Sequence, residues 1–539
     1  MTATVETAVA VDRPDLLELL EAGARGHGTV HFVGEESEPT PIATIWNDAA
    51  VAAAWMADRV GGGNTVAAVL TNSRAAVTAM IGAWRAGCTV ASLPLPARGT
   101  APAVYVEQLT RFCRAAGSEQ LLLDAEYAPL IGDAPLPVST YDDVCAGVGS
   151  RAASSGVPAL VQFTSGSLGV PKGIHLGLDA VGAHVTSIRE ALALGPGDAS
   201  CSWLPLSHDM GLIGQLLTAM CAGAPEFGHH SLTLLKPEKF MANPLSWLRA
   251  CSTSRATVTT VPNFALELAV RMSRRAGAMD LSALRTCIVG SESVRVDTLA
   301  RFTEAFAGAG FHDLAFCPAY GMAEATLAIT IVRPSDPWRA ISHTDPDRDG
   351  AEPTSLVSTG APINGVEVRV AAPDGQAGTI EFRSTSQLSR YIGADLELTS
   401  DGYFVTGDLG LIERGELFVL GRSDEVIVVA GCNLYPADIE PVIEHEAVRP
   451  GCLAAVVAPQ GGMAIVAEPS STKLSADDLE AACRKIRATV AASTGTSPAT
   501  VAFVGRGTLP KTPSGKLRRR TIAQLLAAGD GVMTRVDFK

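Results

Sequence analysis

The sequence predicts an α/β protein in which a large N-terminal region of parallel sheets, flanked by helices, precedes a small α+β domain. In the first part of the chain, short continuous apolar runs alternate with amphipathic segments. This pattern is typical of parallel strands buried between helices. Beyond about Leu356 the runs shorten and are punctuated by glycine, which indicates antiparallel structure and a small β-barrel-like subdomain. A chain of 539 residues, 47% of them hydrophobic, is long enough to bury more than one core.

The first strand-helix-strand unit lies near the N-terminus. Residues 65–70 form an apolar run typical of a strand, and residues 88–95 form the next one. Between them, residues 73–87 are predicted to form a helix, because Ser73 favours a helix start and Gly87 a helix end.

A second series of units lies between Ala256 and Gly321. Strands are expected at 256–262, 284–290 and 314–321, and helices at 263–275 and 296–310. Ligands of parallel sheets collect at the carboxyl ends of the strands. The segments Gly290–Glu292 and Tyr320–Glu324 follow two of these strands and are therefore candidate site segments.

The later part of the chain has a different pattern. Residues 366–384 and 416–422 read as antiparallel strands, and a smaller α+β pattern begins after Arg422. Its strands are expected at 425–431, 452–459 and 463–469, and its helices at Tyr435–Glu446 and Ser475–Ser493. A boundary near Gly421–Asp424 divides the chain into an N-terminal domain, residues 1–420, and a C-terminal domain, residues 421–539.

Charge and composition exclude several classes of protein. The net charge is −14, from 42 basic and 56 acidic residues, which argues against broad binding to nucleic-acid phosphates. The eleven cysteines include no CxxC pair, so neither a zinc ribbon nor a redox pair is expected. The N-terminus shows no signal peptide, and the uncharged run Met210–Pro225 is too short to span a bilayer. A cytoplasmic protein is expected.

The stretch LVQFTSGSLGVPKGIHL, Leu160 to Leu176, predicts a phosphate-binding loop. A loop of Gly, Ser and Thr after a strand offers backbone N–H groups and hydroxyls to phosphate oxygens, and Lys172 adds positive charge. A Walker A loop is excluded, because Pro171 stands where that motif requires glycine and Gly173 where it requires Ser or Thr. For this loop alone, a flexible turn without a ligand is the alternative.

Four further motifs follow in order along the chain. They are WLPLSHDMGLIG at 203–214, AYGMAEATL at 319–327, YFVTGDLG at 403–410 with GRSDEVIVVAGCNLYPADIE at 421–440, and LPKTPSGKLRR at 509–519. Over most of its length the chain thus resembles the adenylate-forming superfamily of acyl-CoA synthetases, peptide-synthetase adenylation domains and luciferases. The forms SWLPLSHDMGLIG, YGMAEATL and GCNLYPADIE are most similar to those of the fatty acyl-AMP ligase branch.

The resemblance implies an ATP site. The residues that match the phosphate-binding motif are Thr164, Ser165, Gly166, Ser167, Gly169 and Lys172. The residues that match the adenine-binding segments are Ser291, Glu292, Ala319, Tyr320, Gly321 and Met322. Asp408 matches the carboxylate that accepts both ribose hydroxyls, and Arg422 is expected to reach the same sugar. Leu168 stands where the family often has threonine, so one hydroxyl is missing from the loop.

The resemblance also implies the catalytic groups. Glu324 matches the Mg²⁺ ligand, as suits a hard cation that bridges phosphate oxygens. Lys516 matches the mobile lysine that bridges the acyl carboxylate and the α-phosphate, and Asp424 falls at the hinge about which the small domain rotates. His208 lies at the entrance of the acyl pocket, where either a gating or a structural role fits.

The function implied is that of a fatty acyl-AMP ligase. Such an enzyme forms an acyl-adenylate and pyrophosphate from a fatty acid and ATP, with Mg²⁺, and transfers the acyl group to the phosphopantetheine thiol of an acyl carrier protein. A weaker expectation is that Arg518, Arg519 and Arg520 seat this acidic partner; a solvated charge run is the alternative.

Other functions are weighed against the same residues. A fatty acyl-CoA synthetase is the nearest alternative, because the segment Ile331–Val357 is shorter than the insertion associated with loss of CoA use. An adenylation domain for amino acids is disfavoured, since no acid precedes Glu267 in the helix that begins NFALELAV. A non-catalytic relative is disfavoured because Glu324, Asp408 and Lys516 are all present.

Overall fold

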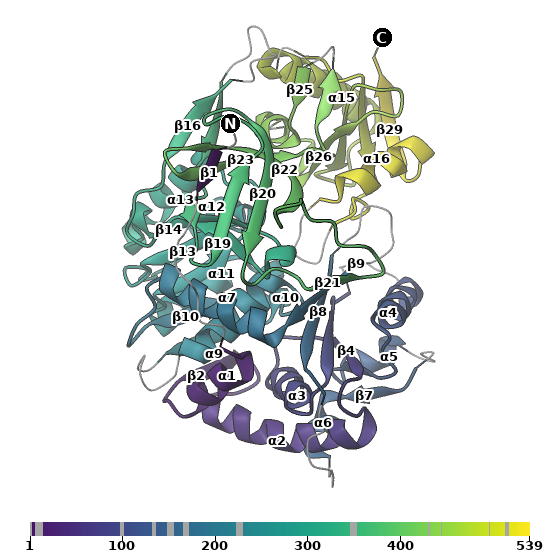
Figure 1. The fold of residues 1–539 in the computed structure, drawn as a ribbon. Coiled ribbons are helices and arrows are strands. Elements are labelled where there is room, and N and C mark those ends of the chain that lie inside the picture. Colours follow the sequence, from purple (N-terminus) through teal and green to yellow (C-terminus); the bar gives the residue numbers. More distant parts are fainter. Residues whose placement is uncertain are drawn as a thin grey trace.

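The structure is a computed structural model of the chain (Figure 1). It describes residues 3–5, 14–96, 102–131, 136–147, 156–164, 172–222, 230–344, 353–429, 432–443, 445–494, 496–511 and 517–538. Among the helices of these residues, none combines the length and the apolar character needed to cross a membrane.

A seven-stranded sheet carries the N-terminal strand-helix-strand units, in the order β21-β9-β8-β5-β4-β6-β7. Its strands are β4 (Thr65–Val69), β5 (Thr89–Leu93), β6 (Leu121–Leu123), β7 (Val138–Thr140), β8 (Ala159–Thr164), β9 (Lys172–Gly177) and β21 (Arg390–Ile392). Strands β4 to β8 are parallel, whereas β9 and β21 are added antiparallel. Its helices are α2 (Ile42–Arg59), α3 (Arg74–Arg85), α4 (Pro102–Ala116), α5 (Ala128–Ile131) and α6 (Tyr141–Ala146). The predicted Ser73 start of α3 is confirmed, since its side chain accepts a hydrogen bond from Ala76 N–H.

A nine-stranded sheet carries the second series, in the order β18-β15-β14-β13-β12-β10-β11-β2-β3. Its strands are β2 (Thr29–Val33), β3 (Thr40–Pro41), β10 (Ala199–Ser202), β11 (Ser231–Leu235), β12 (Val258–Val261), β13 (Thr286–Val289), β14 (Phe316–Gly321), β15 (Ala328–Ile331) and β18 (Ala361–Pro362). The associated helices are α1 (Leu16–Ala24), α7 (Leu178–Ala191), α10 (Pro237–Ala242), α11 (Leu245–Ser254), α12 (Asn263–Met272) and α13 (Val296–Phe306). The parallel pairing of β12, β13 and β14 confirms the predicted order of this series.

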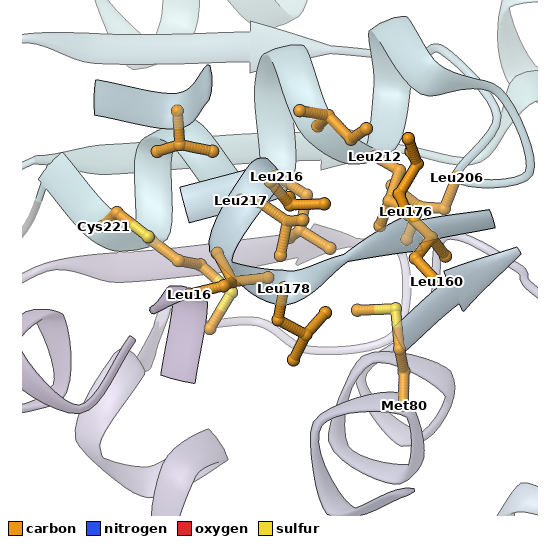
Figure 2. Close-up of a cluster of buried hydrophobic side chains, with 14 of the residues drawn as sticks. Leu16, Met80, Leu160, Leu176, Leu178, Leu206, Leu212, Leu216, Leu217 and Cys221 are labelled. Carbon is orange, nitrogen blue, oxygen red and sulfur yellow. The ribbon is translucent and has the colours of Figure 1, made fainter. Parts of the chain in front are cut away.

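Leucines from both parts of the chain form a common core (Figure 2). Leu160 of β8 and Leu176 of β9 lie close to Leu206 and Leu212. All four side chains are buried, and burial of such a side chain contributes roughly 1.5–3 kcal/mol. Residues 209–222, which include most of the uncharged run, form α8 (Asp209–Gly211), a π-helical turn at Leu212–Leu217 and α9 (Thr218–Ala222).

The glycine-punctuated segment forms a five-stranded sheet of order β1-β19-β20-β22-β23. Its strands are β1 (Ala3–Val5), β19 (Val366–Val370), β20 (Gly378–Ser384), β22 (Phe404–Glu413) and β23 (Glu416–Arg422), and all pairs are antiparallel. This sheet is the barrel-like unit that the sequence predicts. A separate antiparallel pair consists of β16 (Ala340–His343) and β17 (Thr354–Val357).

The last part of the chain forms the α+β unit seen at the upper right of Figure 1. Its elements are β24 (Ile427–Val429), β25 (Cys432–Leu434), α14 (Pro436–Ile439), β26 (Val448–Val457), β27 (Met463–Pro469), α15 (Ala476–Thr494), β28 (Thr500–Val504), α16 (Arg519–Ala528) and β29 (Val532–Asp537). Ser475 and Asp478 exchange hydrogen bonds at the start of α15, as expected of a capping box. The boundary between residues 420 and 421 stays a prediction.

The helix expected over Tyr435–Glu446 is wrong in length. Helix α14 ends at Ile439 and is followed by a 3₁₀ turn at Glu440–Val442. The cause is Pro441, which has no N–H to donate and whose ring collides with the carbonyl of the preceding turn.

His184 of α7 connects β15 and the segment after β20. Its Nε2 accepts a hydrogen bond from Ala328 N–H at 2.8 Å, and its Nδ1 lies 2.8 Å from Ser386 Oγ. The neutral ring with its proton on Nδ1 satisfies both contacts. Burial lowers the pKa of His184 from 6.5 to about 3.

We therefore expect His184 to make the fold sensitive to acid. Between pH 6.5 and 3, the ring of His184 is protonated in the unfolded chain but stays neutral in the folded chain. The free energy of unfolding therefore falls with falling pH by up to about 1.4 kcal/mol per pH unit. Urea unfolding at pH 7, 6 and 5 measures this slope. In His184→Gln, the slope of the free energy of unfolding against pH should be smaller by the amount that corresponds to about one proton. It should be unchanged in His312→Gln, which replaces an exposed histidine. Equal slopes in all three proteins would contradict the assignment.

Candidate active site

The predicted site residues meet in one large cavity. Every one of them whose side chain the structure describes lines this cavity of about 2920 Å³: Lys172, His208, Ser291, Glu292, Ala319, Tyr320, Gly321, Met322, Glu324, Asp408, Arg422 and Asp424. Strands β13 and β14 both end at it, as expected at the carboxyl edge of a parallel sheet. Ser165, Gly166, Ser167, Gly169, Lys516 and the side chain of Thr164 lie outside the described residues.

The carboxylate of Asp408 is a preorganised hydrogen-bond acceptor in the wall of the cavity. Tyr320 Oη donates to Asp408 Oδ2 at 2.7 Å, and Arg422 Nε lies 3.4 Å from Oδ1. Asp408 and Arg422 are direct partners in the pairing of β22 with β23. Burial, and then the adjacent carboxylate, raises the pKa of Tyr320 well above its usual value, so the phenol stays protonated and donates. The carboxylate is thereby fixed in orientation.

Glu324, another residue of the cavity lining, lies on a strained turn. It belongs to a 3₁₀ turn, Ala323–Ala325, that ends at Thr326 with φ +75°. A β-branched residue adopts such a φ only at a cost, and here Thr326 Oγ1 donates to the carbonyl of Ser386. Burial raises the pKa of Glu324, whereas the hydrogen bond from Tyr391 and the charge of Arg422 lower it.

Tyr391 was not predicted as a site residue. Its Oη donates to Glu324 Oε1 at 3.0 Å, and its ring centroid lies 5.5 Å from Lys172 Nζ. The sequence gives no signal for it, because 67 positions separate Tyr391 from Glu324. Only the pairing of β21 with β9 brings it to the site.

The carboxylate of Glu324 fits a magnesium ion that is held mainly by a nucleotide. The described part of the chain contains no group of three or more His, Cys, Asp or Glu side chains that could hold a metal by themselves. Mg²⁺ keeps few protein ligands and is usually bound by one or two carboxylates together with substrate phosphates. A single carboxylate in the same cavity as Lys172 matches that requirement.

The expected phosphate loop connects two paired strands. Thr164, the last residue of β8, pairs with Lys172, the first residue of β9. The lysine is exposed towards the cavity that Tyr391 and Glu324 also line. The two ends of the loop are therefore fixed by the sheet.

The expected adenine wall is built from tight backbone turns. Ser291 has φ +67°, and a Cβ on Gly321 would lie 1.9 Å from the carbonyl oxygen of Leu327, so only glycine fits there. Glu292 Oε1 accepts a hydrogen bond from Phe264 N–H at 2.6 Å, at the start of α12. That contact gives Glu292 a structural task in addition to its place on the wall.

His208 also combines two environments. Its Nδ1 lies 2.6 Å from Asp209 Oδ1 and 3.3 Å from Met210 N, at the start of α8. Its side chain lines the cavity as well. Both roles considered for His208 are therefore compatible with its position.

Comparison with known proteins identifies the family. Residues 27–392 match the AMP-binding enzyme family. The chain belongs to that family. A relative from Caulobacter vibrioides, named as an acyl-CoA synthetase, is 30% identical, with 98% of each chain covered. A relative from Moorena producens, "Medium-chain-fatty-acid--[acyl-carrier-protein] ligase JamA", is also 30% identical, over 67% of this chain and 66% of the other.

A solved structure agrees with this AMP-binding enzyme in fold. It comes from a study of fatty acyl-adenylate ligases from E. coli and L. pneumophila, and it superposes with a TM-score of 0.86 at 24% identity. The match covers 96% of this chain and 98% of the other. The similarity in fold therefore extends over both the large N-terminal sheets and the final α+β unit.

The arginine cluster of this AMP-binding enzyme is largely engaged within the chain. Arg519 donates to Glu440 through two nitrogens, each at 2.8 Å, and to Glu425 at 3.0 Å. Arg520 Nη1 lies 3.3 Å from Asp424 Oδ2. The expectation that the cluster seats a carrier protein stays a prediction, and the guanidinium of Arg519 already has two partly buried carboxylate partners.

Proposed function

We propose that this AMP-binding enzyme activates a fatty acid as its acyl-adenylate and passes the acyl group to a carrier-protein thiol. The observation that carries the proposal is the joint presence in one cavity of the Asp408 acceptor, the Glu324 carboxylate and Lys172. Asp408 is suited to ribose hydroxyls and Glu324 to a phosphate-bound cation.

In the first step a carboxylate oxygen of the fatty acid attacks the α-phosphorus of ATP. The new O–P bond forms as the bond from the α-phosphorus to its bridging oxygen breaks, and pyrophosphate leaves with the electron pair. Both reactants are anions, so the chain must contribute position and positive charge. Lys172 and Lys516 are the proposed cations, Asp408 and Arg422 hold the sugar, and Glu324 would hold Mg²⁺, which supplies further positive charge when bound.

Apolar side chains in the cavity lining support a fatty acyl substrate. They include Ile188 of α7, Leu192 just after it, Ile288 of β13 and Ile331 of β15. These side chains can bury a hydrocarbon chain but offer nothing to a charged group.

An amino acid substrate is not supported. Glu267, the first acid of α12, lies 3.5 Å from Arg295 Nη1 and accepts a hydrogen bond from Thr298 Oγ1 at 3.1 Å. Its carboxylate is thus already paired, and an α-amino group entering the cavity would have to displace these partners.

A carrier protein is the proposed acceptor, and CoA is the alternative. The fatty acyl-AMP ligase resemblance and the name of the Moorena producens relative support the carrier, whereas the name of the Caulobacter vibrioides relative supports CoA. In either case the thiol sulfur attacks the acyl carbonyl carbon, and AMP leaves. The proposed rotation about Asp424 would bring the segment that includes β24 and β25 towards this thiol.

A product assay by mass spectrometry tests the proposal. The enzyme would receive ATP, Mg²⁺ and fatty acids from short to long, with no thiol, with CoA, or with a phosphopantetheinylated carrier protein. We expect acyl-AMP without thiol and acyl-carrier with the carrier. Lys516→Ala should lose acyl-AMP formation, and the surface variant Lys473→Ala should retain it. Acyl-CoA as the main product would show that CoA is the acceptor. Absence of acyl-AMP in every tube would refute the proposal.

A further inference from the structure

Tyr391 lies at the edge of the seven-stranded sheet, next to the strand that leaves the phosphate loop. It is the central residue of β21 and pairs with Ile174 of β9, two residues after Lys172. Figure 1 shows β21 and β9 side by side, below the C-terminal unit. The position of Tyr391 is therefore set by the backbone that also places Lys172.

The segment that carries Tyr391 contacts Glu324 at two points. Leu388 N–H donates to the backbone carbonyl of Glu324 at 2.8 Å, and Tyr391 Oη donates to its side-chain Oε1 at 3.0 Å. The backbone contact fixes the turn, and the side-chain contact fixes the plane of the carboxylate.

The ring of Tyr391 lies close to Lys172. Its centroid lies 5.5 Å from Lys172 Nζ, within the range of a cation–π interaction. One side chain thus contacts both the carboxylate suited to a cation and the ammonium suited to a phosphate.

We propose that Tyr391 is a positioning residue that holds the carboxylate of Glu324 and the ammonium of Lys172 in the relative positions that metal-bound ATP requires. The inference rests on the proposed function. The hydroxyl orients Glu324 towards the cation, and the ring restrains Lys172 near the phosphates of the same nucleotide. Neither group needs to reorganise when the nucleotide binds, which is the advantage of a prepared site.

The two contacts predict separable effects. Tyr391→Phe keeps the ring and removes the hydroxyl, so binding of ATP should require roughly 10- to 150-fold more Mg²⁺, the size of one hydrogen bond to a charged group. Tyr391→Leu removes the ring as well, so affinity for ATP should fall by a further two- to threefold at saturating Mg²⁺. The KM for the fatty acid should not change in Tyr391→Phe.

Tyr403 provides a matched control. Its Oη donates to Glu367 Oε2 at 2.9 Å, and Arg369 lies over its ring with a distance of 3.9 Å from the guanidinium carbon to the centroid. It therefore repeats the chemistry of Tyr391 on another sheet. Tyr403→Phe should bind the nucleotide as the wild type does.

Calorimetric titration of the full chain with α,β-methylene-ATP, at a series of Mg²⁺ concentrations and without fatty acid, tests the inference apart from catalysis. The melting temperature of each variant is recorded alongside. The expected result is a shifted Mg²⁺ dependence in Tyr391→Phe and Tyr391→Leu, and an unchanged one in Tyr403→Phe. Wild-type and Tyr391→Phe proteins with the same Mg²⁺ dependence would overturn the inference and leave the proposed function standing. A wild-type protein that does not bind the analogue would overturn both.

Discussion

Replacement of Glu324 by glutamine should slow acyl-adenylate formation by roughly 10²–10³-fold, the range seen when one electrostatic contact to the reacting group is lost. Glutamine has nearly the same shape and can still accept the hydrogen bond from Tyr391 Oη. What it lacks is the negative charge, and a neutral amide is a poor ligand for Mg²⁺. The rate of ATP–pyrophosphate exchange, measured with saturating fatty acid, reports this step directly.

The control for this prediction is Glu304→Gln, which removes the same charge from an exposed position on α13. It should exchange pyrophosphate at the wild-type rate. If Glu324→Gln stayed within threefold of the wild type, Glu324 would not be the group that meets the metal-bound phosphates. A large loss in both variants would point instead to a general effect of net charge.

Asp408→Asn should raise the KM for ATP by about 10²-fold, because hydrogen bonds from two ribose hydroxyls to a charged group are each worth about 1.5–3 kcal/mol and are only partly replaced by an amide. Asparagine can accept from Tyr320 through its carbonyl oxygen, so the wall itself should stay intact. The turnover number at saturating ATP should change much less, since the sugar is remote from the reacting phosphorus.

Deoxynucleotides make this second prediction specific. The wild type should discriminate strongly against 2′-deoxy-ATP and 3′-deoxy-ATP, and Asp408→Asn should lose most of that discrimination. Asp401→Asn serves as the control, because Asp401 pairs with Arg369 at an exposed position. Equal discrimination in the wild type and Asp408→Asn would show that another group reads the sugar.

Local chemistry explains which elements could be predicted from the sequence. The start of α3 at Ser73 and the start of α15 at Ser475 are set by side chains a few positions away, so the sequence signals them directly. The parallel order of β12 to β14 follows from continuous apolar runs. The prediction of one helix over 435–446 was wrong because it followed the apolar pattern and not Pro441, although that residue already indicated a break.

Long-range contacts explain what could not be predicted at the site. The motifs identify Asp408 and Glu324 because each lies in a recognisable local string. Tyr391 is placed by the register of an edge strand, and no periodicity of the sequence encodes the partner of such a strand. The partners of Arg519 could not be predicted for the same reason, because Glu425 and Glu440 lie 94 and 79 positions away.

Arg422 has two carboxylate neighbours, and this has a thermodynamic consequence. Its Nε lies 3.4 Å from Asp408 Oδ1 and 3.4 Å from Asp424 Oδ1, so one guanidinium is shared between the wall for the sugar and the segment that leads into the last α+β unit. A ligand that draws Asp408 away from Arg422 would strengthen the attraction between Arg422 and Asp424. In the same way, the proposed rotation that removes Asp424 would strengthen the attraction between Arg422 and Asp408. Linkage requires these influences to be equal in both directions. On the proposed function, nucleotide binding at Asp408 and the proposed rotation of the final unit about Asp424 are therefore coupled through the side chain of Arg422.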